Sequence, residues 1–95
     1  MQTYIIFSRF TGETFKKPED LKETAKTVAD KIKSECPGVN WKESFATMGR
    51  FDVVDIVEAE DHRQVEKAAM IIRSYGASFT ETMVATPWKD FLNSL

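Results

Sequence analysis

The sequence predicts an α+β domain in which four strands form one antiparallel sheet and two helices cover the same face of it. Four segments rich in aromatic and β-branched residues have the length of strands, and two longer segments repeat apolar residues at helical spacing. They follow one another in the order strand, helix, strand, strand, helix, strand. This order predicts two right-handed strand–helix–strand units folded together.

The first half of the chain begins with a strand at Gln2–Phe10 and continues with a helix that begins at Pro18. Proline suits the first helical turn because its φ is preset and its missing N–H would have no partner there. Pro37 and Gly38 end the helix, and residues 39–48 alternate as a second strand. The apolar positions of the helix are Leu21, Ala25, Val28, Ala29 and Ile32.

The second half repeats this pattern with a strand at 51–59, a helix, and a strand at 77–86. Asp61 is expected to cap the start of the helix, and Gly76 to end it. We expect the helix to bury Val65, Ala68, Ala69 and Ile72. The order βαββαβ is the ferredoxin-like arrangement, so residues 1–95 are expected to be a single domain with a short helical tail at about 87–95. The second face of its sheet stays bare unless something covers it.

The turn between the second and third strands sets a register for their side chains. A two-residue turn at Gly49-Arg50 pairs position 46 with 53, 44 with 55 and 42 with 57. Asp55 and Ser44 then stand opposite each other, and a carboxylate is costly in apolar surroundings. We therefore expect their side to look into a partly wet cavity on the open sheet face. The opposite side is expected to pack under the helices, with Trp41, Phe45, Val54 and Ile56.

Composition excludes several classes of function. A net charge of −2 over 95 residues gives no general attraction to nucleic acid or to anionic membranes. Cys36 is alone, so no intrachain disulfide can form and a reducing compartment fits best. The chain opens without a basic leader, and we expect a cytoplasmic protein with neither nucleic acid nor membrane as partner. His62 has no companion histidine, so we expect no metal centre, and no cofactor is expected.

Asp55 and Glu81 are the candidate catalytic residues. A pair of carboxylates can hold one pKa high and act as general acid or base, or can bind a cation through oxygen. The same residues are also explained as a polar patch satisfied across a dimer interface by Ser44, Thr80, Arg9 or water. Tyr4 and Ser44 are candidate ligand-binding residues in the same region.

Arg50 and Asp52 form a candidate ligand lip on the hairpin, with one cation and one acceptor. Turn chemistry explains both without a ligand, because Gly49 makes the turn, Asp52 accepts from nearby backbone, and Arg50 is solvated.

The hairpin and its flanks resemble the GYD domain family, which is named for a glycine, an aromatic residue and an aspartate. These residues correspond to Gly49, Phe51 and Asp52 within Thr47-Met48-Gly49-Arg50-Phe51-Asp52, with phenylalanine in place of tyrosine. The segments Thr3-Tyr4-Ile5, Ile56-Val57-Glu58-Ala59 and Thr80-Glu81-Thr82 are similar as well. The resemblance implies the dimeric α+β barrel type, in which two sheets pack face to face, and hence a homodimer or higher homo-oligomer. It implies little chemistry, because the family is known chiefly as uncharacterised small bacterial and archaeal proteins.

Two functional hypotheses follow. The first is a homo-oligomeric small-ligand binding or sensing module with a pocket on the open sheet face, lined by Tyr4, Ser44, Asp55 and Glu81. The alternative is a small cofactor-free enzyme of isomerase or oxygenase type that uses Asp55 as acid or base. A purely structural assembly module, with a dry and filled interface, is a third reading.

Overall fold

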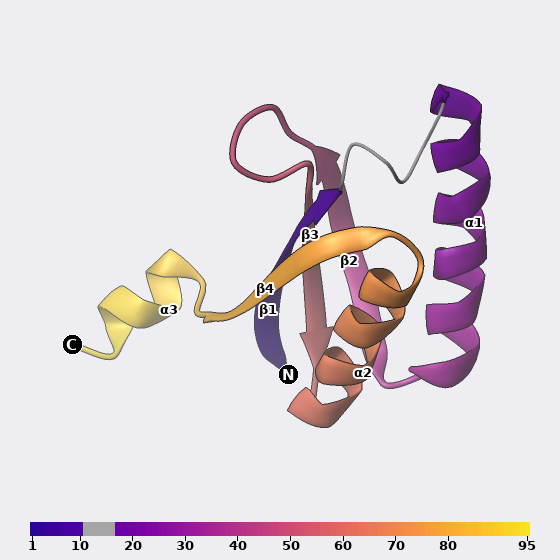
Figure 1. Cartoon of the computed structure of the whole chain (residues 1–95). Helices are drawn as coiled ribbons and strands as arrows, with labels where there is room; N and C mark the ends of the chain where they lie inside the picture. The colour runs from indigo at the N-terminus through magenta and orange to yellow at the C-terminus, as the bar shows by residue number, and fades with distance from the viewer. Residues whose placement is uncertain (11–16) are drawn as a thin grey trace.

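The computed structural model describes residues 1–10 and 17–95 and confirms the ferredoxin-like α+β fold (Figure 1). The four strands form one antiparallel sheet in the order β2-β3-β1-β4, with α1 and α2 on the same face. A third helix follows the last strand and lies away from the other two. The elements are β1 (Gln2–Phe10), α1 (Pro18–Glu35), β2 (Val39–Ala46), β3 (Val53–Ala59), α2 (His62–Ser74), β4 (Ala77–Ala85) and α3 (Trp88–Asn93).

The helix starts follow the local chemistry that the sequence indicates. Pro18 opens α1, and the acidic Glu19 and Asp20 in its first turn suit the positive end of the helix dipole. Asp61 caps α2, because its Oδ1 accepts a hydrogen bond of 2.9 Å from the backbone N of Arg63. None of the helices in the described ranges is long and apolar enough to cross a membrane.

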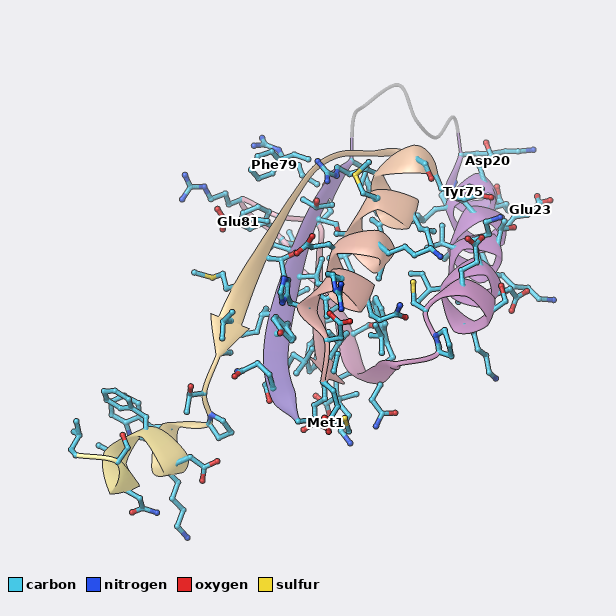
Figure 2. All side chains as sticks on the ribbon, turned by 90° about the horizontal axis from the view of Figure 1, so that it is seen from below. Met1, Asp20, Glu23, Tyr75, Phe79 and Glu81 are labelled. Carbon is cyan, nitrogen blue, oxygen red and sulfur yellow. The ribbon has the colours of Figure 1, made fainter. Side chains whose placement is uncertain are left out.

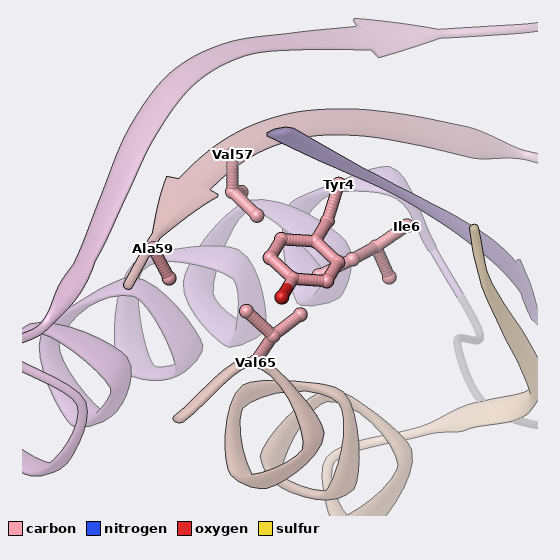
Figure 3. Close-up of a cluster of buried hydrophobic side chains, with 5 residues drawn as sticks. All are labelled: Tyr4, Ile6, Val57, Ala59 and Val65. Carbon is pink, nitrogen blue, oxygen red and sulfur yellow. The ribbon is translucent and has the colours of Figure 1, made fainter. Parts of the chain in front are cut away.

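The core lies between the sheet and the helices. One buried cluster joins β1, β3 and α2 through Tyr4, Ile6, Val57, Ala59 and Val65 (Figure 3). A second cluster joins α1 to α2 through Ile32, Cys36, Ala68 and Ile71. Even-numbered residues of β1 and odd-numbered residues of β3 therefore face the helices, since alternate strand residues share a face.

The loop between β2 and β3 is longer than the predicted two-residue turn. Its first and last residues are joined by a hydrogen bond of 2.9 Å from Thr47 N to Asp52 O, which leaves four residues between them. Gly49 has φ +141°, a conformation that L side chains rarely adopt. An even loop length preserves the predicted pairing, and Ala46 faces Val53 while Ser44 faces Asp55.

The remaining part of the predicted register is wrong, because the register shifts between Trp41 and Glu43. Trp41, instead of Lys42, faces Val57. A bulge of this kind adds one residue to one strand and moves the side chains beyond it to the other face. It brings the Trp41 ring against both buried clusters and leaves Lys42 exposed.

The predicted assignment of the two sheet faces is also wrong. Asp55 shares its face with Val57 and Tyr4, beneath the helices, and is buried. Phe45, Val54 and Ile56 lie on the face that no helix covers. Ile6 and Val57, on the same face as Asp55, are fully buried in this orientation. The free energy gained by burying such apolar residues is larger than the free energy lost by burying one carboxyl group.

The open face carries apolar residues from all four strands, including Phe45, Val54, Phe7 and Met83. The side chains of Phe45, Phe79 and Met83 are each about half exposed. Figure 2 shows Phe79 and Glu81 projecting from β4 on the side away from α1.

Candidate functional site: a pocket beneath α1

A cavity of about 600 Å³ lies between α1 and the sheet. Its walls are mostly apolar, with Leu21, Ala25, Val28 and Ile32 from α1 facing Trp41 and Val53 from the strands. Polar groups reach it from the sheet, where Ser8, Ser44 and Asp55 form part of the lining. Lys33 and Tyr75 also border the cavity. The cavity is thus a largely apolar space with a few polar groups on its sheet side, which is typical of small-molecule sites.

Asp55 is the acidic residue of this pocket and is only 6% exposed. Its Oδ1 accepts hydrogen bonds from Ser44 Oγ at 2.5 Å and from Trp41 Nε1 at 3.3 Å. Trp41 Nε1 also donates to Ser44 Oγ at 2.9 Å, so the three side chains form a closed group. The bulge in β2 creates this group, because it places Trp41 and Ser44 on the same face despite their odd spacing.

The electrostatics of Asp55 are those of a carboxyl group kept from water. Burial raises its pKa above the ordinary value, while the hydrogen bonds from Ser44 and Trp41 act in the opposite direction. Within the described residues it forms no ion pair. A carboxyl group of this kind can donate a hydrogen bond or a proton when neutral, and can bind a cationic or hydrogen-donating group when ionised.

Ser8 is a second polar group in the pocket, and sequence reasoning missed it. It is 1% exposed, and its Oγ has no hydrogen-bond partner among the described residues. It faces Val53 across the β1–β3 pairing, one step along the same face from the Ile6–Asp55 pair. An unpaired buried hydroxyl typically costs about 1–3 kcal/mol, which a ligand or water in the pocket would recover. The alternation of Tyr4, Ile6 and Ser8 along β1 was the available signal.

Tyr4 shares the face of Asp55 but belongs to the core. Its ring packs with Ile6, Val57 and Val65 in the buried cluster, and it is not among the residues that line the cavity (Figure 3). Ser44 lies at the position that the sequence predicts, directly opposite Asp55.

Glu81 lies on the other side of the sheet, so the structure does not bring the two candidate carboxylates together. Glu81 faces Phe7 across the β1–β4 pairing and points to the open face (Figure 2). Asp55 shares the face of Tyr4 and Val57 and points to the helices. Glu81 lines a separate groove of about 440 Å³ with Arg9, Arg50, Phe51 and Phe79. The rings of Phe51 and Phe79 stack there with centroids 6.2 Å apart.

Arg50 and Asp52 occupy different environments although they are close in sequence. Asp52 Oδ2 accepts a hydrogen bond of 2.8 Å from the backbone N of Phe10, and its own N donates to Ser8 O at 2.9 Å. These bonds join the hairpin to β1. Arg50 is exposed and lines the groove on the open face. Asp52 therefore performs the backbone-accepting role that turn chemistry indicates.

The described residues contain no cluster of three histidine, cysteine, aspartate or glutamate side chains suited to a metal ion. Cys36 is buried, and burial raises the pKa of its thiol, which disfavours the reactive thiolate.

Comparison with known proteins agrees with the family resemblance that the hairpin residues indicate, and the matches extend over nearly the whole chain. A curated relative from Thermus thermophilus, named glutamine synthetase and cystathionine beta-lyase binding protein, is 33% identical over 99 residues. The match spans 100% of this chain and 99% of that protein.

Among solved structures, TTHA0845 from Thermus thermophilus matches with a TM-score of 0.62 and 20% identity, over 92% of this chain and 95% of that one. A dimeric ferredoxin-like protein of unknown function from Thermobifida fusca matches with a TM-score of 0.56 and 15% identity, over 90% of each chain. At these identities the two structures share the fold. The GYD domain matches residues 4–95, nearly the whole chain, and the protein belongs to the GYD domain family.

Proposed function

We propose that this protein is a homo-oligomeric module that binds a small molecule in the pocket beneath α1. The observation that carries the proposal is the presence of two buried polar groups, Asp55 and Ser8, in a largely apolar cavity. The pocket therefore lies on the helix-covered face, in place of the open face that the hairpin register predicts.

The ligand is expected to be largely apolar with one polar end. A cavity of about 600 Å³ is in the range of ligand sites, and the α1 wall is mostly aliphatic, with Thr24 and Lys33 as its polar residues. The polar end would lie on the sheet, where Ser8 Oγ has unused hydrogen-bonding capacity. Asp55 would contribute Oδ2, because Oδ1 already accepts from Ser44 and Trp41.

The proposed oligomer uses the open face, where a second copy would cover the half-exposed Phe45, Phe79 and Met83. A two-fold axis presents the same surface from both copies, so a surface with both signs of charge can complement itself. Arg50 and Glu81 provide the two signs at the edge of this face. The solved relative from Thermobifida fusca is described as dimeric, which agrees with this arrangement.

A protein-binding module is a second candidate, favoured by the name of the relative from Thermus thermophilus. That protein is named for binding two enzymes, and the exposed apolar residues of the open face could serve a similar contact here. A cofactor-free enzyme is a third. The raised pKa of Asp55 favours it, because a carboxyl group that keeps its proton to a higher pH than usual is better suited to general acid catalysis.

A thermal-shift screen of small amphiphiles and apolar metabolites, followed by calorimetry, tests the ligand proposal. We expect hits that bind the wild type and bind Ser8→Ala at least about tenfold more weakly, since one hydrogen bond to a buried group is lost. Glu81→Gln, on the opposite face, is the matched control and should bind as the wild type does.

The result that contradicts the proposal is a set of hits whose affinity is unchanged by Ser8→Ala and by Asp55→Asn. Hits that respond to Glu81→Gln instead would move the site to the open face. Turnover of a bound compound that is lost in Asp55→Asn would establish the enzyme in place of the binding module.

A further inference from the structure

The C-terminal segment places apolar side chains in water without packing them on its own domain. Trp88 is 71% exposed and Leu95 is 85% exposed, while Phe91 and Leu92 are more than two-fifths exposed. The ring contact of this segment is internal, between Trp88 and Phe91 with centroids 5.6 Å apart. Its backbone hydrogen bonds, such as those from Phe91 N to Pro87 O and from Leu95 N to Leu92 O, are internal as well.

A helix as short as α3 is not expected to persist in water by itself. Isolated helices of fewer than about 12 residues are marginal, because the cost of nucleation is not repaid. Most helical stability in proteins comes from packing an apolar face. The six residues of α3 therefore require a packing partner. The described part of their own chain does not provide one, because none of these six residues is buried.

The chain directs α3 toward the side of the open face. Pro87 has φ −53° and ψ +136°, an extended conformation that carries the chain beyond the end of β4. Gln2 Nε2 donates to Ala85 O at 2.9 Å and so ties the end of β4 to the start of β1. Figures 1 and 2 both show α3 on the side of the sheet away from α1.

A second copy on the open face would meet α3. The loop between β2 and β3 extends on the same side at the other end of the sheet (Figure 1). The loop and α3 thus border the open face at its two ends. The half-exposed Phe45, Phe79 and Met83 are on this face, so a partner that covers it and reaches α3 would bury both sets of apolar residues.

We propose that α3 is an exchanged arm, with Trp88 and Phe91 of each copy packing against the other copy of this chain. This proposal rests on the proposed homo-oligomer and adds a specific element to it. By two-fold symmetry each arm is given and received once, so loss of both rings from each chain removes four rings from every dimer interface. Aromatic residues of this kind are frequent hot spots of interfaces.

Sedimentation velocity over a range of concentrations tests the arm through the double variant Trp88→Ser/Phe91→Ser. We expect its self-association to be at least about tenfold weaker than that of the wild type, with an unchanged far-UV circular dichroism spectrum of the domain. Lys89→Ala, in the same helix, is the matched control and should associate as the wild type does. Equal association of the double variant and the wild type would overturn the proposal.

Fluorescence of Trp88 gives an independent measurement. The chain has two tryptophans, so Trp41→Phe leaves Trp88 as the reporter. We expect its emission to shift to the blue as the concentration rises through the dimerisation range. A dimer in which Trp88 emission stays that of an exposed ring would overturn the arm and leave the sheet-to-sheet dimer standing. A wild-type protein that is monomeric at every concentration would overturn the homo-oligomer itself.

Discussion

The two faces of this sheet differ in what they bury and in what they leave exposed. The helix-covered face combines a tightly packed cluster around Ile6 with a cavity that contains Asp55 and Ser8. Within the described part of the chain no helix covers the open face, and Phe45 and Phe79 are exposed there to about half of their area. The difference fits the two proposed roles, a ligand pocket inside one chain on the covered face and a contact with a second copy on the open face.

The comparison also shows why the hydrophobic pattern of one strand does not distinguish the covered face from the open face. Along β3, Val54 and Ile56 point to the open face, whereas Asp55 and Val57 point to the helices. Both sets are mostly apolar, so the hydrophobic pattern of β3 is that of a strand buried on two sides. This agrees with a sheet that lies between its own helices and a second copy.

The largest expected effect is on the packed part of the covered face. Ile6→Ala should lower the free energy of unfolding by about 2–5 kcal/mol, because it leaves a cavity at a fully buried position. Urea denaturation followed by circular dichroism measures the change. Met83→Ala is the open-face control and should cost less than about 1 kcal/mol in the monomer, since that side chain is half exposed. Equal losses of unfolding free energy in Ile6→Ala and Met83→Ala would show that the two faces do not differ in how tightly they are packed.

Much of this architecture could be predicted from the residues themselves. Pro18 and Asp61 fix the starts of the two long helices through local chemistry that does not depend on the rest of the fold. The pairing of Ser44 with Asp55 follows from the even length of the hairpin loop. These features depend on short-range rules, and the structure confirms them.

The site could be predicted only in part, because it depends on longer-range geometry. The bulge that aligns Trp41 with Ser44 leaves no mark in a two-residue alternation, and without it these two side chains are assigned to opposite faces. The predicted face of Asp55 is wrong for another reason, because a carboxyl group is expected to avoid the helix-packed side. Glu81 is separated from Asp55 by the pairing of β4 with β1, which no local pattern encodes. The sequence around Ser8 does not distinguish it from an ordinary strand residue, and only its burial in the fold marks it as a candidate.

The second effect tests whether the open face is an interface. Phe79→Asp should weaken self-association by at least about tenfold, since it replaces an apolar ring that a second copy would cover with a charged side chain. The monomer should keep its fold, because Phe79 is about half exposed. Native mass spectrometry and sedimentation measure the association. Thr82→Asp, also on β4 but on the other side of that strand, is the control and should have a smaller effect.

The third effect is the pH dependence of stability caused by Asp55. Burial raises its folded-state pKa above the ordinary value of 3.8, so the folded protein retains this proton to higher pH than the unfolded chain does. The free energy of unfolding should therefore fall as the pH rises from the ordinary pKa to the raised pKa, and the loss is complete above that window. Asp55→Asn should remove this contribution and raise stability at pH 7 by about 1 kcal/mol.

The measurement is a series of urea denaturations from pH 3 to pH 8 on both proteins, with the difference between them taken at each pH. Taking the difference cancels the contributions of Glu35 and Asp61, whose pKa values are lowered by Lys31 and Arg63 and act in the opposite direction. A difference that is independent of pH would show that Asp55 is not held away from water.

The smallest expected effect on stability belongs to Ser8, and it distinguishes a ligand site from a structural hydroxyl. Ser8 Oγ has no protein partner among the described residues, and water in the pocket would recover most of the cost of its burial, so Ser8→Ala should leave the free energy of unfolding within about 0.5 kcal/mol or raise it slightly. A hydroxyl that stabilised the fold through a hidden hydrogen bond would instead cost about 1 kcal/mol when removed. Ser44→Ala provides the contrast, because it removes a donor to Asp55 and should be the more costly change. If Ser8→Ala is the more destabilising of the two, the hydroxyl serves the fold and the pocket loses one of its two proposed ligand contacts.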